Sequence, residues 1–400
     1  MKRKRILNAL LGVLVSVSII ACSAGSNVET QTSENDGLKI GFISTTSGPQ
    51  SIIGQHMIDG FNLGIKHAGG SLGGLETEVI VGDDQVKPDI GLQVADKLLK
   101  SDRVDMVAGV IWSNVMMAIH QPITDSETIL IGTNAGPSPI AGAQCSPYFF
   151  STSYQNDQVH AAMGQYAQDQ GVQEMVLIAP NYQAGKDGLA GFKEYYQGNV
   201  ADEIYTELGQ VDFSAVMSRV SSLSPEAVYV FMPGSDGINF IKQWEQAGLS
   251  DQIPLYSGFT INAVTLPAIG DAAEGLMGGM FWVPDMDNPV NQKFVEDFQA
   301  TYGYAPSEFA ASSYDAALLI DSALKQVNGD LSDKEALREA LKQANFESVR
   351  GSFKFNTNQF PIQNFYVQEV VRGEDGALTL QTKDQIFTDF GDKFASQCSM

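Results

Sequence analysis

Three short loops of small polar residues carry the groups best suited to hold a small anion. They are residues 44–49, 111–114 and 133–138, and each follows a run of strand-forming residues. Ligands of open α/β sheets bind at the carboxyl ends of the strands, where backbone N–H groups and helix dipoles attract anions without Arg or Lys. Ser113, at a predicted helix start, can donate its hydroxyl and its N–H to a carboxylate. The alternative is that Ser47 and Ser113 are plain N-caps.

Other chemistries find no support in the residue spacing. The four histidines, at 56, 67, 120 and 160, share no metal-ligand spacing, and the chain has no C-x-x-C pair. A G-x-S-x-G match occurs at residues 69–73, but a helix precedes it and a strand follows, the reverse of a nucleophile elbow. No glycine-rich nucleotide loop lies between a strand and a helix. We therefore expect no enzyme, no metal and no cofactor.

Alternating strand and helix patterns predict the frame that positions these loops. Strands are expected at residues 38–43, 78–81, 104–110 and 128–131, with amphipathic helices between them. This order predicts a parallel sheet covered by helices on both faces.

The same order begins again after residue 170. Further strands are expected at 175–179, 204–206, 227–232 and 254–257, and three helices follow in succession at 288–302, 307–327 and 333–343. Two strand-like runs, 351–355 and 364–371, come last. No Pro/Ser-rich linker separates the two units, so we predict two closely coupled α/β lobes.

Composition narrows the classes of partner. The chain has 400 residues with a hydrophobic fraction of 44%, enough for a large core, and 47 acidic against 24 basic residues give a net charge of −23. Nucleic acid is therefore not expected as a partner, because phosphate binding needs a basic surface. Small anions depend on local dipoles and are not excluded.

The first residues predict export. Four basic residues at positions 2–5 precede a mostly apolar run, 6–20, which is too short to span a membrane and is typical of a secretory signal. The segment ends in Ala21-Cys22, which resembles the lipobox of bacterial lipoproteins. We expect a signal peptide over 1–21, a lipid on Cys22, and an anchor and polar tether over 22–37. Cleavage nearby that leaves Cys22 a free thiol is the alternative.

Cys145 and Cys398 then remain as an even pair in an oxidising compartment. A disulfide between them would close a very long loop, and two unpaired thiols are the alternative.

Several stretches together resemble the leucine/isoleucine/valine-binding proteins, which are type I periplasmic solute-binding receptors of ABC importers. The opening match is LKIGFI at 38–43, Ser47-Gly48-Pro49, Gly54, Gly60 and Gly69-Gly70. It continues through 83–88, 109–113 and 270–275, and the stretches 134–138, 144–153 and 180–187 resemble a branch associated with aromatic acids.

This resemblance implies two doubly wound parallel-sheet lobes joined by three crossovers, with ligand held between them by hinge closure. The first lobe is expected to hold residues 38–153 plus 284–345, and the second 154–283 plus 346–400.

The resemblance also implies the site. Ser113, Ala135 and Gly136 are expected to receive the ligand's carboxylate. The remaining expected ligand-binding residues are Ser47, Trp112, Asn114, Asn134, Tyr182, Ala184, Pro233, Gly234, Gly258 and Phe259.

The ligand's other end is where this chain departs from amino-acid-binding relatives. Those relatives meet the α-ammonium with an acidic side chain at a position that falls here on Gly258, and no Asp or Glu lies between residues 253 and 269. A buried ammonium without a counter-charge would cost several kcal/mol. Two tyrosine positions change to Ala184 and to Pro233-Gly234, which widens the second-lobe wall. An aromatic acid is therefore favoured, with a branched-chain amino acid next.

The expected function is a lipid-anchored receptor in the periplasm or on the cell surface. It is expected as a monomer that delivers a small carboxylate to the permease and ATPase of an ABC importer. A sensory module that reports to a membrane receptor is the alternative, and a secreted hydrolase would need a Ser/His/Asp set that no sequence context supports.

Overall fold

The structure is a computed structural model, and it describes residues 37–400. The expected signal peptide, the lipidation at Cys22 and all but the last residue of the tether lie outside the described residues.

The first sheet forms early in the chain from runs of buried β-branched and aromatic residues. Its strand order is β2-β3-β1-β4-β5-β6, with only β2 antiparallel. The strands are β1 (Leu38–Ser44), β2 (Ser71–Leu72), β3 (Leu75–Asp83), β4 (Met106–Gly109), β5 (Ile129–Gly132) and β6 (Phe149–Ser151). The order reverses between β1 and β4, which makes that edge a topological switch point, the usual place for a ligand.

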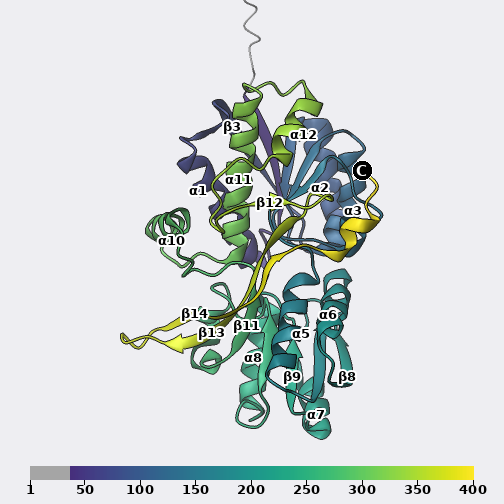
Figure 1. The fold of residues 1–400 in the computed structure, drawn as a ribbon, viewed down its shortest axis with the longest axis vertical. Coiled ribbons are helices and arrows are strands. Elements are labelled where there is room, and N and C mark those ends of the chain that lie inside the picture. Colours follow the sequence, from purple (N-terminus) through teal and green to yellow (C-terminus); the bar gives the residue numbers. More distant parts are fainter. Residues whose placement is uncertain (1–36) are drawn as a thin grey trace, which may run out of the picture. The chain divides into compact units, whose positions relative to one another are not determined.

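The second sheet repeats this arrangement. Its order is β12-β13-β11-β10-β9-β7-β8, with β14 paired to β13, and its switch point lies between β7 and β9. The strands are β7 (Glu174–Pro180), β8 (Asn199–Thr206), β9 (Ala227–Val230), β10 (Leu255–Gly258), β11 (Met277–Met280), β12 (Lys354–Phe355), β13 (Pro361–Arg372) and β14 (Leu378–Phe390). The strands β7 to β11 are parallel, and the long ribbon β13–β14 adds antiparallel pairs (Figure 1).

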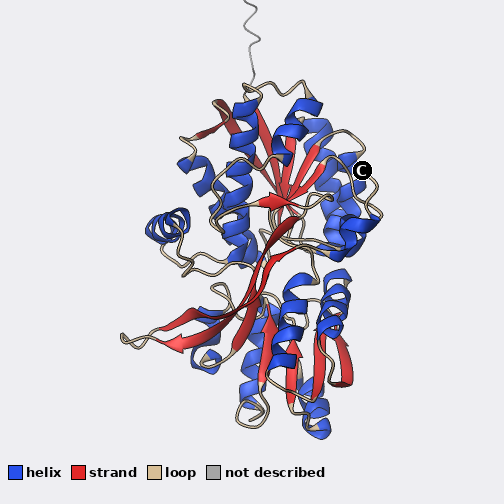
Figure 2. Ribbon diagram, in the orientation of Figure 1, coloured by secondary structure: helices blue, strands red, loops and turns tan. Residues whose placement is uncertain are grey.

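Helices cover both faces of the sheets (Figure 2). In the first lobe α1 packs on α11 and α2 packs on α3; in the second α5 packs on α6. The bounds are α1 (Ser51–His67), α2 (Pro88–Lys97), η1 (Leu98–Asp102), α3 (Ser113–Thr124), α4 (Ser138–Ala141), α5 (Gln158–Asp169), α6 (Gln183–Tyr195), α7 (Ser214–Leu223), α8 (Ser235–Gln246), α9 (Leu266–Ile269), η2 (Gly270–Ala273), α10 (Pro289–Tyr302), α11 (Glu308–Gln326), α12 (Lys334–Lys342) and η3 (Lys393–Gln397). The predicted pair of doubly wound lobes is confirmed.

Arg350 lies where the connections between the lobes run together. Its side chain is 5% exposed, and its Nη2 lies 2.9 Å from Oδ2 of Asp315, which is fully buried. The same guanidinium donates to the carbonyl oxygens of Thr152 (2.6 Å) and Ser153 (3.2 Å), on the first connection, and lies 5.5 Å from the Phe281 ring, near the second. One buried cation therefore joins backbone that leads from one sheet to the other.

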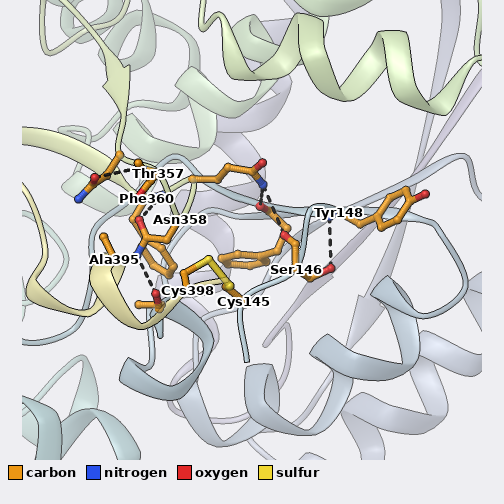
Figure 3. Close-up of a disulfide and its surroundings, with 12 residues drawn as sticks. Cys145, Ser146, Tyr148, Thr357, Asn358, Phe360, Ala395 and Cys398 are labelled. Atoms are coloured by element: carbon orange, nitrogen blue, oxygen red, sulfur yellow. Dashed lines mark hydrogen bonds between the residues drawn. A yellow bond between two sulfur atoms is a disulfide. The ribbon is translucent and has the colours of Figure 1, made fainter. Parts of the chain in front are cut away.

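The segment 346–400, expected in the second lobe, contributes to both cores. It supplies β13 and β14 to the second sheet, while Phe360 is buried in the first core and Phe394 packs against it. After β14 the chain returns to the first lobe, where Cys398 is bonded to Cys145 (Figure 3).

Candidate functional site

A small cavity lies where the two switch points face each other. The space in it that the centre of a water-sized sphere can reach is about 20 Å³, so the lining residues lie close together in this structure. The first lobe contributes Ile53, Ile111, Trp112, Ser113, Asn134, Ala135 and Phe309. The second contributes Tyr182, Ala184, Phe231, Pro233 and Phe259, and Tyr154 and Asn156 come from the connection between the lobes. None of these side chains carries a formal charge.

The helix α3 begins at the cavity because β4 ends in a sharp turn. Gly109 has a φ of +111°, and a Cβ there would overlap the carbonyl of Ile43, so this turn requires glycine. Ser113, the first residue of α3, is 2% exposed. The first N–H groups of a helix have no partner within it, and they attract negative charge. The polar end of the cavity is thus a helix N-terminus with a hydroxyl beside it.

The neighbouring polar groups of this wall are bonded within the protein. Trp112 Nε1 donates to Thr45 (2.8 Å), and Asn134 Nδ2 donates to the carbonyl of Ile111 (2.7 Å). The Ala135 N–H donates to the carbonyl of Val110 (3.1 Å). Ser113 is different: as a donor, its hydroxyl has only a 3.5 Å contact, with Asn156 Oδ1, and can turn toward a ligand.

Asn156 lies beside Ser113 and completes the polar end. Its Oδ1 accepts the Gly136 N–H (3.1 Å), and its Nδ2 donates to Ser113 Oγ (3.0 Å). Ser113 Oγ lies 3.5 Å from Asn156 Oδ1, the outer limit for a hydrogen bond. Ser113, Ala135 and Gly136, the three residues expected to receive the ligand's carboxylate, thus lie close together. In this structure, however, the backbone N–H groups of Ala135 and Gly136 already donate to acceptors within the protein.

The second-lobe wall is aromatic. The ring of Tyr182 stacks on Phe231 with centroids 6.3 Å apart, and Tyr154 stacks on Phe259 at 4.7 Å. Behind them His160 contacts Phe231 edge-on at 4.9 Å, and burial lowers the pKa of His160 to about 3. Neutral at physiological pH, this wall offers apolar and π surface rather than charge.

Five of the expected site residues do not line the cavity. Ser47 is exposed, Asn114 donates to the carbonyl of Val86 (3.4 Å), and Gly136 lies behind Ala135. Gly234 packs against Gln50, and a Cβ at Gly258 would overlap the Tyr229 hydroxyl.

Among the residues that sequence reasoning missed are Tyr154, Asn156 and Phe231. Phe231 directly follows β9, so its position at a strand's carboxyl end was an available signal. No comparable signal marks Asn156, because its partners lie far away in sequence.

Polar contacts join the lobes around the cavity. Gln50 Nε2 donates to Asp236 (2.9 Å), the Ser138 hydroxyl donates to Asp187 (2.7 Å), and Asn262 Nδ2 donates to Glu308 (2.7 Å). Burial raises the pKa of Glu308 to about 7 and that of Asp236 to about 6. The cavity is therefore enclosed by direct lobe-to-lobe hydrogen bonds.

Other parts of the described chain provide weaker candidates for a binding site. A larger hollow of about 820 Å³ opens along α10 and α11, away from the strand ends, and its Lys325 is paired with Asp321 (2.6 Å). Within residues 37–400, no group of three or more His, Cys, Asp or Glu residues is placed to hold a metal. Over the same residues, no helix combines the length and apolarity that crossing a membrane requires.

Comparison with known proteins agrees with this geometry. The family model for periplasmic binding proteins matches residues 37–377. A Leu/Ile/Val-binding protein homolog of Brucella melitensis is 28% identical over 352 residues, which cover 85% of this chain and 89% of that protein.

Solved structures are similar over nearly the whole chain. A solute-binding protein of an ABC transporter from R. palustris, in complex with benzoate, is 32% identical with a TM-score of 0.86, covering 91% of this chain and all of that one. Another, from Rhodopseudomonas palustris BisB5 in complex with 3,4-dihydroxybenzoic acid, is 28% identical with a TM-score of 0.84, over 90% and 99% of the two chains.

These relatives are solute-binding proteins rather than enzymes, as the sequence predicts. Family membership also implies a periplasmic location. The chain belongs to the periplasmic binding protein family, and its two-lobed fold is that of the type I solute receptors that serve ABC transporters.

Proposed function

We propose that this protein captures a small aromatic carboxylate for an ABC importer, through closure of its two lobes. The observation that carries the proposal is the unlike chemistry of the cavity's two ends. One end has the α3 N-terminus and Ser113, which suit a carboxylate, and the other has Tyr182, Phe231 and Phe259, which suit a ring.

The absence of a carboxylate among the cavity's lining residues supports this ligand class. A bound amino acid would bring an ammonium group into an enclosed site, and a buried ammonium needs a counter-charge. Within the described chain, the side chains lining the cavity are neutral. The benzoate and dihydroxybenzoate complexes of two relatives favour the same class.

Calorimetry with the purified protein tests the proposal. Benzoate, 4-hydroxybenzoate and leucine are titrated separately, and we expect heat from at least one aromatic acid and none from leucine. Micromolar leucine binding with no heat from either aromatic acid would overturn the aromatic assignment.

Closure of residues 38–153 plus 284–345 against 154–283 plus 346–400 is part of the proposal, as is a monomeric receptor. Ligand contacts that exist only when the lobes meet shift the population toward the closed form. Small-angle scattering should give a smaller radius of gyration at saturating ligand. An unchanged radius, with binding verified by calorimetry, would exclude hinge closure.

Lipid attachment at Cys22 completes the proposed receptor, with a permease and an ATPase as its membrane partners. Mass spectrometry of the mature N-terminus should show diacylglyceryl Cys22 and no residue before it. The Cys22→Ser variant is the control and should leave the membrane fraction. A mature N-terminus at any other residue would contradict the anchor.

A further inference from the structure

Asp187 lies behind the polar end of the cavity, on α6 of the second lobe. It is 8% exposed, and its carboxylate accepts four hydrogen bonds, all from neutral groups. The donors are the N–H (3.0 Å) and hydroxyl (2.7 Å) of Ser138, Nε2 of Gln183 (2.8 Å) and Nδ2 of Asn156 (2.9 Å). Ser138 belongs to the first lobe, so this arrangement exists only while the lobes are in contact.

The carboxylate of Asp187 determines how the Asn156 side chain is turned. An ionised carboxylate can only accept, so the NH₂ group of Asn156 must face Asp187. Its Oδ1 then faces the Gly136 N–H, 3.1 Å away. The reverse orientation would set two acceptors against each other at Asp187 and two donors against each other at Gly136.

This orientation determines in turn what Ser113 can do. The second amide hydrogen of Asn156 is donated to Ser113 Oγ (3.0 Å), so Ser113 acts there as an acceptor. Its own hydrogen has only a long contact with Asn156 Oδ1 (3.5 Å) and is left for a closer acceptor. Ser113 lines the cavity whereas Asp187 does not. A chain of three residues therefore presents a hydrogen-bond donor to the ligand.

We propose that Asp187 is a positioning residue: through Asn156 it holds the Ser113 hydroxyl as a donor, and so makes the cavity select a carboxylate over the neutral amide of the same shape. The inference rests on the proposed carboxylate function and adds a residue that does not touch the ligand. Because Asp187 also binds Ser138, the selection operates when the lobes close.

The test compares a carboxylate with its amide in wild type and Asp187→Asn. The probes are benzoate with benzamide and leucine with leucinamide, titrated by calorimetry. An amide at position 187 no longer fixes Asn156, so part of the Ser113 population donates to Asn156 instead of the ligand. We expect carboxylate affinity to fall roughly five- to tenfold, less than the loss of a whole hydrogen bond to a charged group because only part of the population turns away, while the affinity for the amide changes less than about twofold.

Asp236→Asn is the matched control. Asp236 is also a buried aspartate of the second lobe bonded across to the first, through Gln50 (2.9 Å), but neither Ser113 nor Asn156 contacts it. A loss of closure alone should lower both affinities by the same factor. An unchanged carboxylate-to-amide ratio in Asp187→Asn would overturn the proposal.

A double-mutant cycle separates positioning from general damage to the fold. In a Ser113→Ala background, Asp187→Asn should lower carboxylate affinity by less than about a further twofold, because the hydroxyl that Asp187 positions is already absent. Fully additive losses would contradict it. If Asp187→Asn fails to fold, Asn156→Ala breaks the same chain and should give the same change of ratio.

The two proposals fail separately. If the wild type binds leucine but no aromatic acid, the aromatic ligand class is wrong and the leucine pair carries the test of Asp187. If only 4-hydroxybenzoate binds, it and its amide carry the test of Asp187, and a wild type that binds none of benzoate, 4-hydroxybenzoate and leucine overturns both proposals.

Discussion

The two lobes present the same structural position to the cavity with opposite chemistry. In the first lobe the residues after β4 and β5 bring the polar Ser113 and Asn134 and the start of α3 to the surface of the cavity, beside the apolar Ile111 and Trp112. In the second, the residues after β7, β9 and β10 bring Tyr182, Phe231 and Phe259. Since the strand order is repeated, the difference lies in the side chains and not in the topology.

This difference shows how one cavity can demand two properties of a ligand. A molecule with only a carboxylate satisfies the first lobe and leaves the aromatic wall without a partner. A molecule with only a ring leaves the α3 N-terminus unpaired. Full closure is therefore most favourable with a ligand that carries both groups, one at each end of the cavity.

A disulfide bond ties the C-terminal segment to the first lobe. Of the changes considered, removing this bond is expected to have the largest effect, on the free energy of unfolding. The only cysteines after residue 22 are Cys145 and Cys398, which are bonded across a separation of 253 residues. In the chain-entropy model such a loop contributes roughly 5 kcal/mol. Cys145→Ala with Cys398→Ala should lower the free energy of urea unfolding by up to this amount. Reduced wild type is the control and should match the variant; equal midpoints for the variant and oxidised wild type would show that the first lobe does not depend on the disulfide.

The contact of Glu308 with Asn262 joins the lobes and should make their docking depend on pH. Burial raises the pKa of Glu308 to about 7, above its ordinary value of 4.5. The folded protein therefore binds a proton that the unfolded chain releases, so this contribution is complete below pH 4.5 and is lost as the pH rises through 7. Its full size is on the order of 3 kcal/mol.

Unfolding measured at pH 5 and pH 8 tests this in wild type and Glu308→Gln. Asp236 contributes with the same sign, because burial raises its pKa to about 6. The difference between the two proteins isolates Glu308. A pH dependence identical in both would mean that Glu308 does not take up a proton on folding.

Removing a ring from the second-lobe wall tests whether that wall binds the ligand. Phe231→Ala should weaken benzoate binding by roughly 2 kcal/mol, through lost apolar contact and ring packing. Phe231→Leu keeps most of the apolar surface and should lose less. Equal benzoate affinity in wild type and Phe231→Ala, measured by calorimetry, would remove this ring from the binding wall.

The smallest expected effect is on the polar wall. Ser113→Ala should weaken benzoate binding by about 1–2 kcal/mol, since one hydrogen bond to a charged group is lost. Ser113→Thr restores the hydroxyl and should recover most of the affinity. Unchanged binding in Ser113→Ala would leave Ser113 as the start of α3 and nothing more.

The sequence was informative where local pattern determines structure. Strands such as 38–43 and 175–179 are short buried runs, and the structure has them as β1 and β7. The short strand β6 and the glycine-containing β11 were missed, because neither is long enough for a pattern. The outer strand β14 was also missed, because polar residues interrupt its alternation at residues 383–385.

For the site, the loops that carry Ser113 and Asn134 could be located because they follow predicted strands. The bonds of Asn156 to Ser113 and Asp187 could not, because they depend on how distant segments meet when the lobes come together. Gly258 illustrates both cases: its lack of a side chain is plain in the sequence, but the Tyr229 hydroxyl that fills the space is visible only in the structure.

The bond between Cys145 and Cys398 also sets an order on how this protein can be made. The first sheet is fully present in the chain once residue 151 has been synthesised, but its packed helices α11 and α12 end at residue 342 and its covalent link waits for residue 398. The second sheet likewise lacks β13 until residue 372. Neither lobe can finish folding while the other half of the chain is still emerging, so the two lobes mature together and late.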